Sequence, residues 1–338
     1  SVLILEKMDS IGGNSVISEG QVAVPGTPMQ AAAGLKDSPE LFARDMLTLG
    51  YINKPDHVRL VASEALNTFF WTEQELGVVW YHDRVEYDIG HSVRRCALLR
   101  NHSGSGLVYP LLERVTALGA VIRLRRKVVH LNRDAASGRV TGVWVTDGKT
   151  ESGLHFIAAR RGVVLASGGF GADIPMRMMQ NWRLSEHVGT TTQPGATSEL
   201  IREAIRIGAW AIHMEYIHCI PDASPDEKGW GNTWRFSRYC AASQGIWVVQ
   251  ETGRRFVNET APNDVRTNAV LDVLNDGCHC LAVADARAVR HPHSVIFSAD
   301  DVEQLVARGF VRRYDTLEDL AYDASVPLTA LKESVDNY

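Results

Sequence analysis

Two short apolar runs, each ending at polar or glycine residues, constrain the fold most strongly. Residues 2–5 are all apolar and end at Glu6, and residues 162–166 run without interruption into Ser167-Gly168-Gly169. Continuous apolar runs of this length are typical of strands buried on both faces of a parallel sheet. The carboxyl ends of such strands border the ligand crevice of an open α/β sheet. The sequence therefore predicts an α/β fold with a binding site at these two strand ends.

Capping and turn signals divide the rest of the chain into further elements. Helices are predicted over residues 39–49, 55–76 and 107–118, after Thr197, and from Ala299 and Pro327. Strands are predicted over residues 120–124, 127–131, 140–146 and 245–250. From about Glu215 the chain becomes rich in aromatic residues, glycine, proline and serine. This order predicts an α/β domain over residues 1–214 and an inserted α+β capping domain over residues 215–338.

Composition and charge exclude several classes of protein. The 338 residues carry 35 basic and 40 acidic side chains, with a formal net charge of −5, and they include no long basic stripe. Binding to nucleic acid is therefore not expected. No run of about 18 apolar residues is present, so no transmembrane segment is expected. The chain begins without methionine or a signal peptide; a cytoplasmic location is favoured, and a periplasmic one stays open because an export signal would precede Ser1.

The cysteines offer no disulfide framework. Five cysteines occur, an odd number without a repeated spacing, and reduced thiols are expected in a chain of this size. Cys278-His279-Cys280 brings metal-ligating residue types together, but its cysteines are closer than in the usual zinc motifs and no second pair follows. We expect these three residues to pack at a strand end, with metal binding as the remote alternative.

The residues at the predicted strand ends are suited to binding a nucleotide. In a dinucleotide-binding unit, an acid at a strand end hydrogen-bonds ribose hydroxyls, and Glu6 has this position; capping of the strand end is the alternative. Gly12-Gly13-Asn14-Ser15 and Gly168-Gly169 lack Cβ atoms that would keep a pyrophosphate or flavin away from the backbone. Tight turns are the alternative for both glycine pairs. The glycine-rich turn that precedes the acid in such units is not in this chain.

In combination, these motifs resemble those of the fumarate reductase/succinate dehydrogenase flavoprotein family, and most closely its soluble, flavocytochrome-c-like branch. The resemblance rests on Leu5-Glu6-Lys7, on residues 12–15, 165–170, 194–197, 215–217, 224–229 and 326–338, and on Gly253-Arg254-Arg255-Phe256-Val257-Asn258-Glu259. It covers essentially the whole chain. The family implies a Rossmann-like FAD-binding domain with an inserted, mobile α+β capping domain, and a substrate held between the two over the flavin.

The resemblance also implies which residues bind FAD. Glu6 would hold the ribose, the turn at Gly12, Gly13, Asn14 and Ser15 would line the pyrophosphate and isoalloxazine, and other residues would border the cofactor. These are Lys7, Gly20, Val129, Ala166, Ser167, Gly168, Thr191 and Glu199. No histidine lies between Gly13 and Gly26, where membrane-bound members carry the histidine that bonds covalently to FAD. FAD is therefore expected to bind non-covalently.

Both ends of the chain depart from the family pattern. Family members have a glycine-rich loop before the position of Glu6, and a last segment after Tyr338 that brings a substrate-binding histidine and arginine. This chain has neither, so we expect it to be part of a longer protein. Without that loop the pyrophosphate would lose backbone donors, and the 338 residues alone are expected to bind FAD weakly.

The proton donor of the fumarate reductases is replaced. In these reductases an arginine four residues after the Asn-Glu pair, here Asn258-Glu259, gives a proton to the substrate carbon. That position is Asn263, whose amide cannot act as a general acid. Arg266 lies about one helical turn further on and is no obvious substitute.

Other polar positions are replaced as well. Counting back without gaps, the relay glutamate and arginine of the family fall at Tyr239 and Ala242. The histidine that holds a substrate carboxylate falls at Ile220, although His218 is close. The sequence therefore does not predict fumarate itself as the substrate.

An aromatic group lies near the replaced positions and includes Trp230, Trp234, Phe236 and Tyr239. Packing of an irregular loop is one interpretation, which we favour. The other is a wall for a substrate that is larger and less charged than a dicarboxylate. Tyr239 would then act as acid or base through its phenol, as tyrosines do in the ketosteroid dehydrogenases of the wider superfamily.

The sequence thus predicts an FAD-dependent oxidoreductase that reduces or forms a carbon–carbon double bond next to an electron-withdrawing group of a small-molecule substrate. The direction of the reaction stays open. An electron-donor protein or domain is a candidate partner. Three alternatives remain: a catalytically inactive flavoprotein subunit, a ketosteroid-dehydrogenase-like enzyme, and a nicotinamide enzyme with the same nucleotide-binding unit.

Overall fold

The chain contains two compact units. A computed structural model describes all residues except 1, 89, 148–152, 224–234, 293 and 295–296. The first unit comprises residues 1–172 and 193–212, and the second comprises residues 173–192 and 213–338. The predicted division into an FAD-binding domain and a capping domain between residues 214 and 215 stays a prediction.

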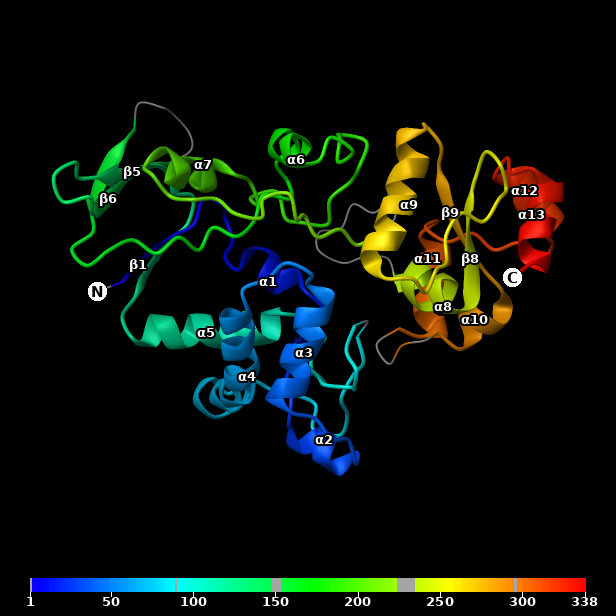
Figure 1. The fold of residues 1–338 in the computed structure, drawn as a ribbon, viewed down its shortest axis with the longest axis horizontal. Helices are drawn as coiled ribbons and strands as arrows, with labels where there is room; N and C mark the ends of the chain where they lie inside the picture. Colours follow the sequence, from blue (N-terminus) through cyan, green and yellow to red (C-terminus); the bar gives the residue numbers. More distant parts are fainter. Residues whose placement is uncertain (1, 89, 148–152, 224–234, 293, 295–296) are drawn as a thin grey trace. The chain divides into compact units, whose positions relative to one another are not determined.

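The first unit combines helices with short strands (Figure 1). Its strands are β1 (Leu3–Leu5), β2 (Gln21–Ala23), β3 (Cys96–Leu98), β4 (Val121–Arg123), β5 (Lys127–Arg133), β6 (Val140–Thr146) and β7 (His155–Ala158). Its helices are α1 (Gly13–Ile17), α2 (Pro28–Ala32), α3 (Pro39–Leu49), α4 (Pro55–Leu76), α5 (Ser105–Ala117) and α7 (Glu199–Arg206). The predicted helices over residues 39–49 and 55–76 are confirmed. Their ends follow the local signals, because Ser38 caps α3 and Gly77 ends α4 with a φ of 69°.

Strand β1 pairs in parallel with β4, and β5, β6 and β7 form an antiparallel meander. The predicted strand at the start of the chain is therefore confirmed, although Leu3 and Ile4 are each 37% exposed rather than buried. The predicted strand over residues 162–166 is wrong, because these residues have no regular secondary structure and Val164 is 90% exposed. An apolar run becomes a strand only where a neighbour completes its hydrogen bonds, and no described strand pairs with this one.

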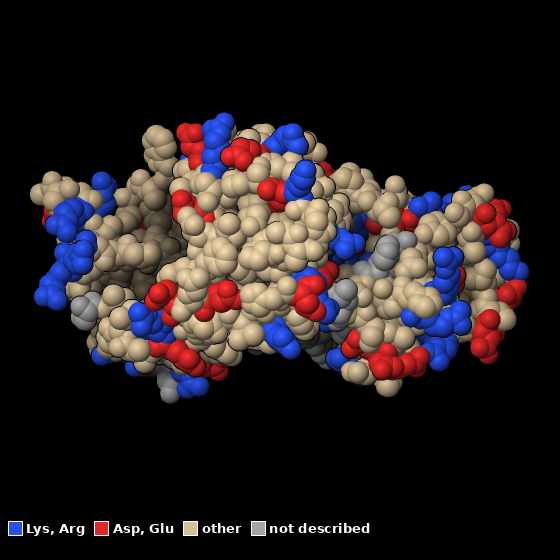
Figure 2. Space-filling view, turned by 90° about the horizontal axis from the view of Figure 1, so that it is seen from below, with Lys and Arg blue, Asp and Glu red and all other residues tan. Residues whose placement is uncertain are grey.

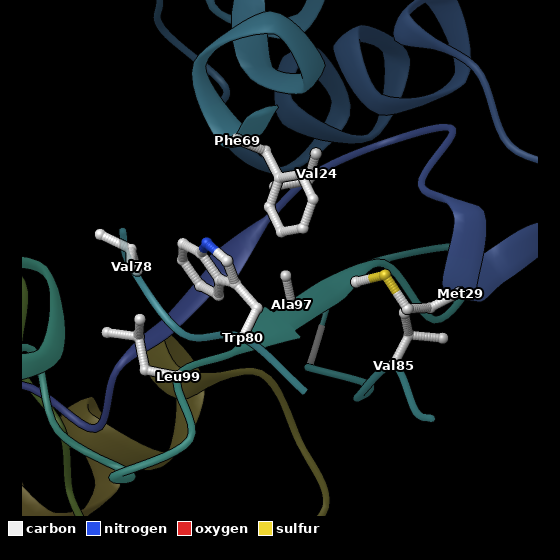
Figure 3. Packing of buried hydrophobic residues seen from close by; sticks show 8 residues of the cluster. All are labelled: Val24, Met29, Phe69, Val78, Trp80, Val85, Ala97 and Leu99. Atoms are coloured by element: carbon white, nitrogen blue, oxygen red, sulfur yellow. The ribbon is translucent and has the colours of Figure 1, made fainter. Parts of the chain in front are cut away.

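The helical part of the first unit has its own core (Figure 3). The rings of Phe69 on α4 and Trp80 lie 5.1 Å apart between centroids, and the indole Nε1 donates to Thr72 at 3.2 Å. The other buried members are Val24, Met29, Val78, Val85, Ala97 and Leu99. This core joins α4 to the paired strands β2 and β3, which precede and follow the helix in the sequence.

A buried charge network lies beside this core. The guanidinium of Arg95 is fully buried and donates from Nε and Nη2 to Asp37 at 2.9 Å each, and from Nη1 to Asp45 at 2.6 Å. Gln30 donates to Asp37 at 2.8 Å, which adds a further donor to this carboxylate. Burial opposes the charge on Arg95, but the two carboxylates outweigh this effect and raise its pKa above the ordinary value. This network fixes α2 and α3 against the segment that contains Arg95.

The second unit is built around an antiparallel pair of strands (Figure 1). These are β8 (Gly245–Val249) and β9 (Cys280–Ala284). Its helices are α6 (Ile174–Gln180), the π-helical turn η1 (Ser237–Ala241), α8 (Ala242–Gln244), α9 (Asn263–Asn275), α10 (Ala286–Arg290), α11 (Ala299–Ala307), α12 (Leu317–Asp323) and α13 (Leu328–Asp336). Alternate residues of β8 face opposite sides, as the pleat requires. Ile246 and Val248 pack against α12 and α13, whereas Trp247 packs against the side that contacts α9.

Candidate functional site

The carboxylate of Glu6 lies at the end of β1. Its backbone N–H donates to Arg123 at 3.0 Å and its carbonyl accepts from Arg126 at 2.8 Å, so the parallel pairing with β4 continues through this residue. One carboxylate oxygen, Oε1, accepts from the N–H of Met8 at 2.7 Å. The second oxygen makes no hydrogen bond with any described residue. Glu6 can therefore accept a hydrogen bond from a ligand hydroxyl while its position is fixed by the backbone.

The turn after β1 is open to close approach at Gly13, whereas a Cβ atom on Gly12 would lie 2.0 Å from Val16 Cγ2. Gly12 and Gly13 have φ values of 100° and 50°, in the region that glycine adopts readily. A Cβ atom on Gly13 would have only Gln193 Nε2 within 4 Å, at 3.7 Å. Asn14 Oδ1 accepts from the N–H of Gln193 at 2.8 Å, and Ser15 lies in the short helix α1. The turn thus contacts residues that come 179 positions later in the chain.

Residues 193–199 return to the end of β1 through charged and polar side chains. Lys7 Nζ donates to Thr197 Oγ1 and to Glu199 Oε2, the latter at 3.2 Å, and Lys127 Nζ donates to Glu199 Oε1 at 3.0 Å. Partial burial of Glu199 would raise its pKa, but hydrogen bonds from Thr197, Lys127 and Lys7 outweigh burial and lower the pKa to about 2. Glu199 is therefore an anion at any ordinary pH and bridges the end of β1 to β5.

The backbone at Gly195 lies close to two side chains. A Cβ atom there would lie 2.8 Å from Met8 Cγ and 2.9 Å from Gln193 Nε2, so a larger residue would make these side chains shift. The structure therefore brings together six of the predicted cofactor residues: Glu6, Lys7, Gly12, Gly13, Asn14 and Glu199. Gln193, Gly195 and Lys127 belong to the same cluster. Sequence reasoning did not include these three among the candidate cofactor residues, although the Pro194-Gly195 turn was a local signal.

The segment that contains Ala166, Ser167 and Gly168 is exposed. Val163 packs against the same apolar cluster as Leu5, and the N–H of Ala172 donates to Ala196 at 3.0 Å, so both ends of the segment are near the cluster just described. Gly168 has a φ of 73°, and a Cβ atom on it would have no other atom within 4 Å. The backbone at Gly168 can therefore accommodate a ligand.

Three further predicted cofactor residues are not part of the cluster at the end of β1. Gly20 has a φ of 74°, and a Cβ there would lie 2.9 Å from the backbone of Ser103, so close packing alone explains this glycine. Val129 lies at a bulge in β5, where its neighbours Val128 and His130 pair with successive residues of β6. Thr191 belongs to the second unit. All three stay predictions as cofactor contacts.

The cluster at the end of β1 fits a dinucleotide. It offers a carboxylate oxygen for ribose hydroxyls, a turn without Cβ atoms for phosphates, and two lysine side chains beside them. These are the groups expected for the ribose and pyrophosphate of FAD.

A second cluster of predicted residues lies in the second unit, at the start of α9. Arg266 donates from Nη1 to Asp222 Oδ1 at 2.8 Å and from Nη2 to Asn263 Oδ1. The Arg266 and Asp222 side chains are 3% and 2% exposed, and the guanidinium lies 5.3 Å from the centroid of the Trp247 ring. Burial raises the pKa of Asp222, against the opposing effects of Arg266 and Arg238. Sequence reasoning missed Asp222, for which no local signal exists.

The segment that contains His218 and Ile220 reaches the same helix. The carbonyl of Cys219, between these two residues, accepts from Thr267 Oγ1 at 3.4 Å. His218 is exposed, whereas Ile220 is half-buried. The structure therefore brings His218, Ile220, Asn263 and Arg266 into one region of the second unit.

Tyr239 lies in different surroundings. Its ring packs in the cluster of Cys240 and Phe297, with its centroid 5.9 Å from that of Phe297. Phe236 contacts both this cluster and that of Trp247. Trp230 and Trp234, the other members of the predicted aromatic wall, lie outside the described residues. The catalytic role of Tyr239 stays a prediction.

The Gly253–Glu259 stretch of the family motif has a structural role within the second unit. Glu259 is 3% exposed and accepts from the backbone N–H of Trp247 at 2.7 Å and from Arg255 Nη2 at 2.6 Å. Gly253 has a φ of 68°, and a Cβ there would lie 2.8 Å from the carbonyl of Pro327. The motif thus fixes β8 and positions the loop that leads into α9.

Other kinds of site find little support in the described part of the chain. It contains no group of three metal-ligating side chains, and none of its helices is long and apolar enough to cross a membrane. Burial raises the pKa of Cys96 and Cys280 to about 12, so neither is a reactive thiolate at neutral pH. Figure 2 shows Lys and Arg side chains interspersed with Asp and Glu over the face that it draws.

Comparisons with known proteins agree with this description. A family model described as "FAD binding domain" matches residues 1–338. The acrylate reductase flavoprotein subunit of Shewanella woodyi is 36% identical over an alignment that covers 100% of this chain and 66% of the relative. The urocanate reductase of Eggerthella lenta is 29% identical, over 100% of this chain and 54% of the relative. The chain thus spans between half and two thirds of the length of these two relatives.

A comparison of structures gives the fold. The open conformation of a flavocytochrome c3 fumarate reductase superimposes with a TM-score of 0.79 at 23% identity, covering 100% of this chain and 56% of that one. The predicted fold class, a Rossmann-like α/β domain for FAD with an inserted cap, is confirmed by this likeness together with the matched family.

Proposed function

Because the chain belongs to the FAD-binding flavoprotein family that includes the fumarate reductases, we propose that the whole protein is an FAD-dependent oxidoreductase that acts on a carbon–carbon double bond next to an electron-withdrawing group. Reduction of the double bond is the direction that the names of the relatives favour. We further propose that FAD is bound without a covalent link.

One observation supports this proposal above the others: relatives that align over the entire chain are named for the reduction of acrylate and of urocanate. Acrylate and urocanate are different molecules, but both have a double bond conjugated with a carboxylate. A substrate of this class therefore fits the likeness better than a saturated alcohol or amine. The acrylate relative is named a subunit, so we also propose a partner protein or domain that delivers electrons.

The residues at the end of β1 would hold the cofactor. Glu6 would accept hydrogen bonds from the ribose, and the backbone of Gly12 and Gly13 would lie against the pyrophosphate. The Lys7–Glu199–Lys127 bridge would keep this region rigid, because it joins three segments of the first unit. When bound, FAD supplies hydride chemistry at a carbon of the substrate.

The proton that accompanies the hydride needs a donor of its own. Asn263 cannot be that donor, since an amide does not ionise near neutral pH. We propose Tyr239 for this role, with His218 and Ile220 facing the substrate. Arg266 is buried in its ion pair with Asp222, so it would act through neighbouring side chains.

The proposal is tested with the purified full-length protein under anaerobic conditions. A flavin absorption band should be present, and flavin reduced with dithionite should be reoxidised by acrylate, urocanate or another conjugated acid. Propionate, which has no double bond, should leave the flavin reduced and serves as the control. A bound flavin that no conjugated acid reoxidises would favour a catalytically inactive subunit, and the absence of flavin would contradict the proposal.

A further inference from the structure

The amide of Asn263 is held in a single orientation. Asn263 is the first residue of α9, and its Oδ1 accepts a hydrogen bond from Nη2 of Arg266, one turn along the helix. A guanidinium has donors and no acceptor, so only the oxygen of the amide can face it. The NH₂ group must then point away from Arg266. It makes no hydrogen bond with any residue that the structure describes, and Asn263 is only half-buried.

The group that fixes this amide is unusually constrained for a residue at a helix start. Arg266 is held by Asp222 at 2.8 Å, and both side chains are at least 97% buried. Burying an ion pair costs desolvation energy, and a well-packed apolar pair of similar size is often at least as stable. The stability of the fold therefore gives little reason for the Arg266–Asp222 pair. Its effect on the orientation of the Asn263 amide is a better reason.

The same cluster contains buried donors for which no described residue supplies an acceptor. Nε of Arg266 and Nε1 of Trp247 are both buried donors without a partner among the described residues. Buried donors are almost always satisfied in proteins. With the NH₂ group of Asn263, three donors in this region have no acceptor in the described part of the chain, which points to a ligand that brings an oxygen.

The charge balance indicates what kind of oxygen this is. The positive charge of Arg266 is matched by Asp222, and Asp264, next to Asn263, is exposed. The region thus has hydrogen-bond donors, and Arg238 is a further positive charge that acts on Asp222. The region suits an oxygen of the electron-withdrawing group, which gains further negative charge during the reaction.

We propose that the NH₂ group of Asn263 donates a hydrogen bond to the oxygen of the electron-withdrawing group of the substrate and stabilises the negative charge that develops there. Arg266 and Asp222 are positioning residues that set the direction of the amide. The inference rests on the proposed function, because addition of hydride to a conjugated double bond moves electron density onto that oxygen. Asn263 forms and breaks no covalent bond.

Substitution of Asn263 in the full-length, FAD-loaded protein tests the proposal. Asn263→Asp keeps the acceptor for Arg266 but removes the NH₂ group, and Asn263→Ala removes both. Loss of one such donor to a developing oxyanion typically lowers kcat by about 10²–10³-fold. We expect both variants to reoxidise reduced flavin with acrylate at least about 100-fold more slowly.

Binding of a saturated analogue distinguishes stabilisation of the developing negative charge from binding of the unreacted substrate. Propionamide has a carbonyl oxygen but neither the double bond nor the negative charge of acrylate. Loss of a neutral hydrogen bond to this oxygen should raise the Kd of propionamide by less than about tenfold. The expected pattern is thus a large fall in kcat with a small rise in Kd. An unchanged kcat in both variants, or equal changes in kcat and Kd, would overturn the proposal.

Asn268→Asp is the matched control, since Asn268 lies on the same helix and its Oδ1 also accepts from an arginine, Arg183, at 3.0 Å. Its kcat and Kd should equal those of the wild type. Arg266→Lys keeps the positive charge opposite Asp222 but loses the fork that reaches Asn263, and should lower kcat with little change in KM.

Failure of the proposed function would be visible separately. If no conjugated acid reoxidises the wild-type flavin, the proposed function fails, and the inference is then judged on propionamide alone. Weaker propionamide binding by Asn263→Ala than by the wild type would support the amide as a donor. Equal binding by the two, or no binding to the wild type, would overturn it.

Discussion

Replacement of Glu199 by glutamine would test the bridge between the end of β1, β5 and residues 193–199. The carboxylate has two lysine partners and a pKa of about 2 in place of the ordinary 4.5. At about 1.36 kcal/mol per pH unit, this difference corresponds to at most about 3.4 kcal/mol of stability. Because the Glu199 side chain is 31% exposed, solvent screening reduces that figure, and we expect a loss of about 1–2 kcal/mol at pH 7.

The pH dependence of this loss follows from the direction of the pKa change. A carboxylate whose pKa is lowered on folding stabilises the protein above its unfolded pKa, and this stabilisation disappears as the pH falls toward the folded pKa. For Glu199 the contribution should be complete above about pH 4.5 and decline between about pH 4.5 and 2. The difference between the wild type and Glu199→Gln should therefore be smaller at about pH 3.5 than at about pH 7.

Urea unfolding followed by tryptophan fluorescence at these two pH values would measure the difference. Glu113→Gln provides the control, because Glu113 is an exposed carboxylate on α5 of the same unit. Its substitution should change the free energy of unfolding by less than about 0.5 kcal/mol. A loss for Glu199→Gln that is the same at both pH values would refute the ion-pair reasoning, as would no loss at the higher pH.

Three further outcomes are expected. Arg95→Met should lower the free energy of unfolding by about 3–5 kcal/mol in urea titrations, since it leaves the fully buried carboxylate of Asp37 without its bidentate partner. Gly20→Ala should lower the free energy of unfolding by about 1–3 kcal/mol in the same assay, and by more than Gly34→Ala does. Both glycines have φ near 70°, but only Gly20 has backbone atoms within 3 Å of the new methyl group. Tyr239→Phe should lower kcat by about 10²-fold or more if the phenol transfers a proton, and normal turnover would exclude that role.

Local signals were sufficient to predict most helices of the first unit. Ser38 and Pro39 at the start of α3, and Gly77 at the end of α4, act within a single turn of the backbone. Their effect therefore does not depend on the rest of the fold. The strand at residues 162–166 could not be judged in this way, because a strand needs a partner that the run itself does not specify. The apolar pattern was real, but it gave no information on pairing.

In the candidate sites, too, residues close together in the sequence could be predicted, and contacts between distant residues could not. Glu6 and the Gly12-Gly13 turn are close together in the sequence and were identified from their residue types and order. Lys7 and Glu199 are separated by 192 positions, and Asp222 and Arg266 by 44. Glu199 was expected only through the family resemblance, and Asp222 was not expected at all. Contacts of this kind depend on the tertiary fold, to which a single sequence gives no direct access.

The resemblance places Asn263 where the fumarate reductases have an arginine, and the surroundings of Asn263 offer a physical reason for the difference. The guanidinium of Arg266 lies beside the side chain of residue 263, where it uses the carboxylate of Asp222 as its counter-ion. A second arginine at position 263 would place two positive charges next to a single buried carboxylate, which the low-dielectric surroundings would penalise. Asparagine avoids this repulsion and still offers hydrogen-bond donors. An asparagine at position 263 is therefore compatible with the neighbouring Arg266, and it does not by itself indicate the loss of catalysis.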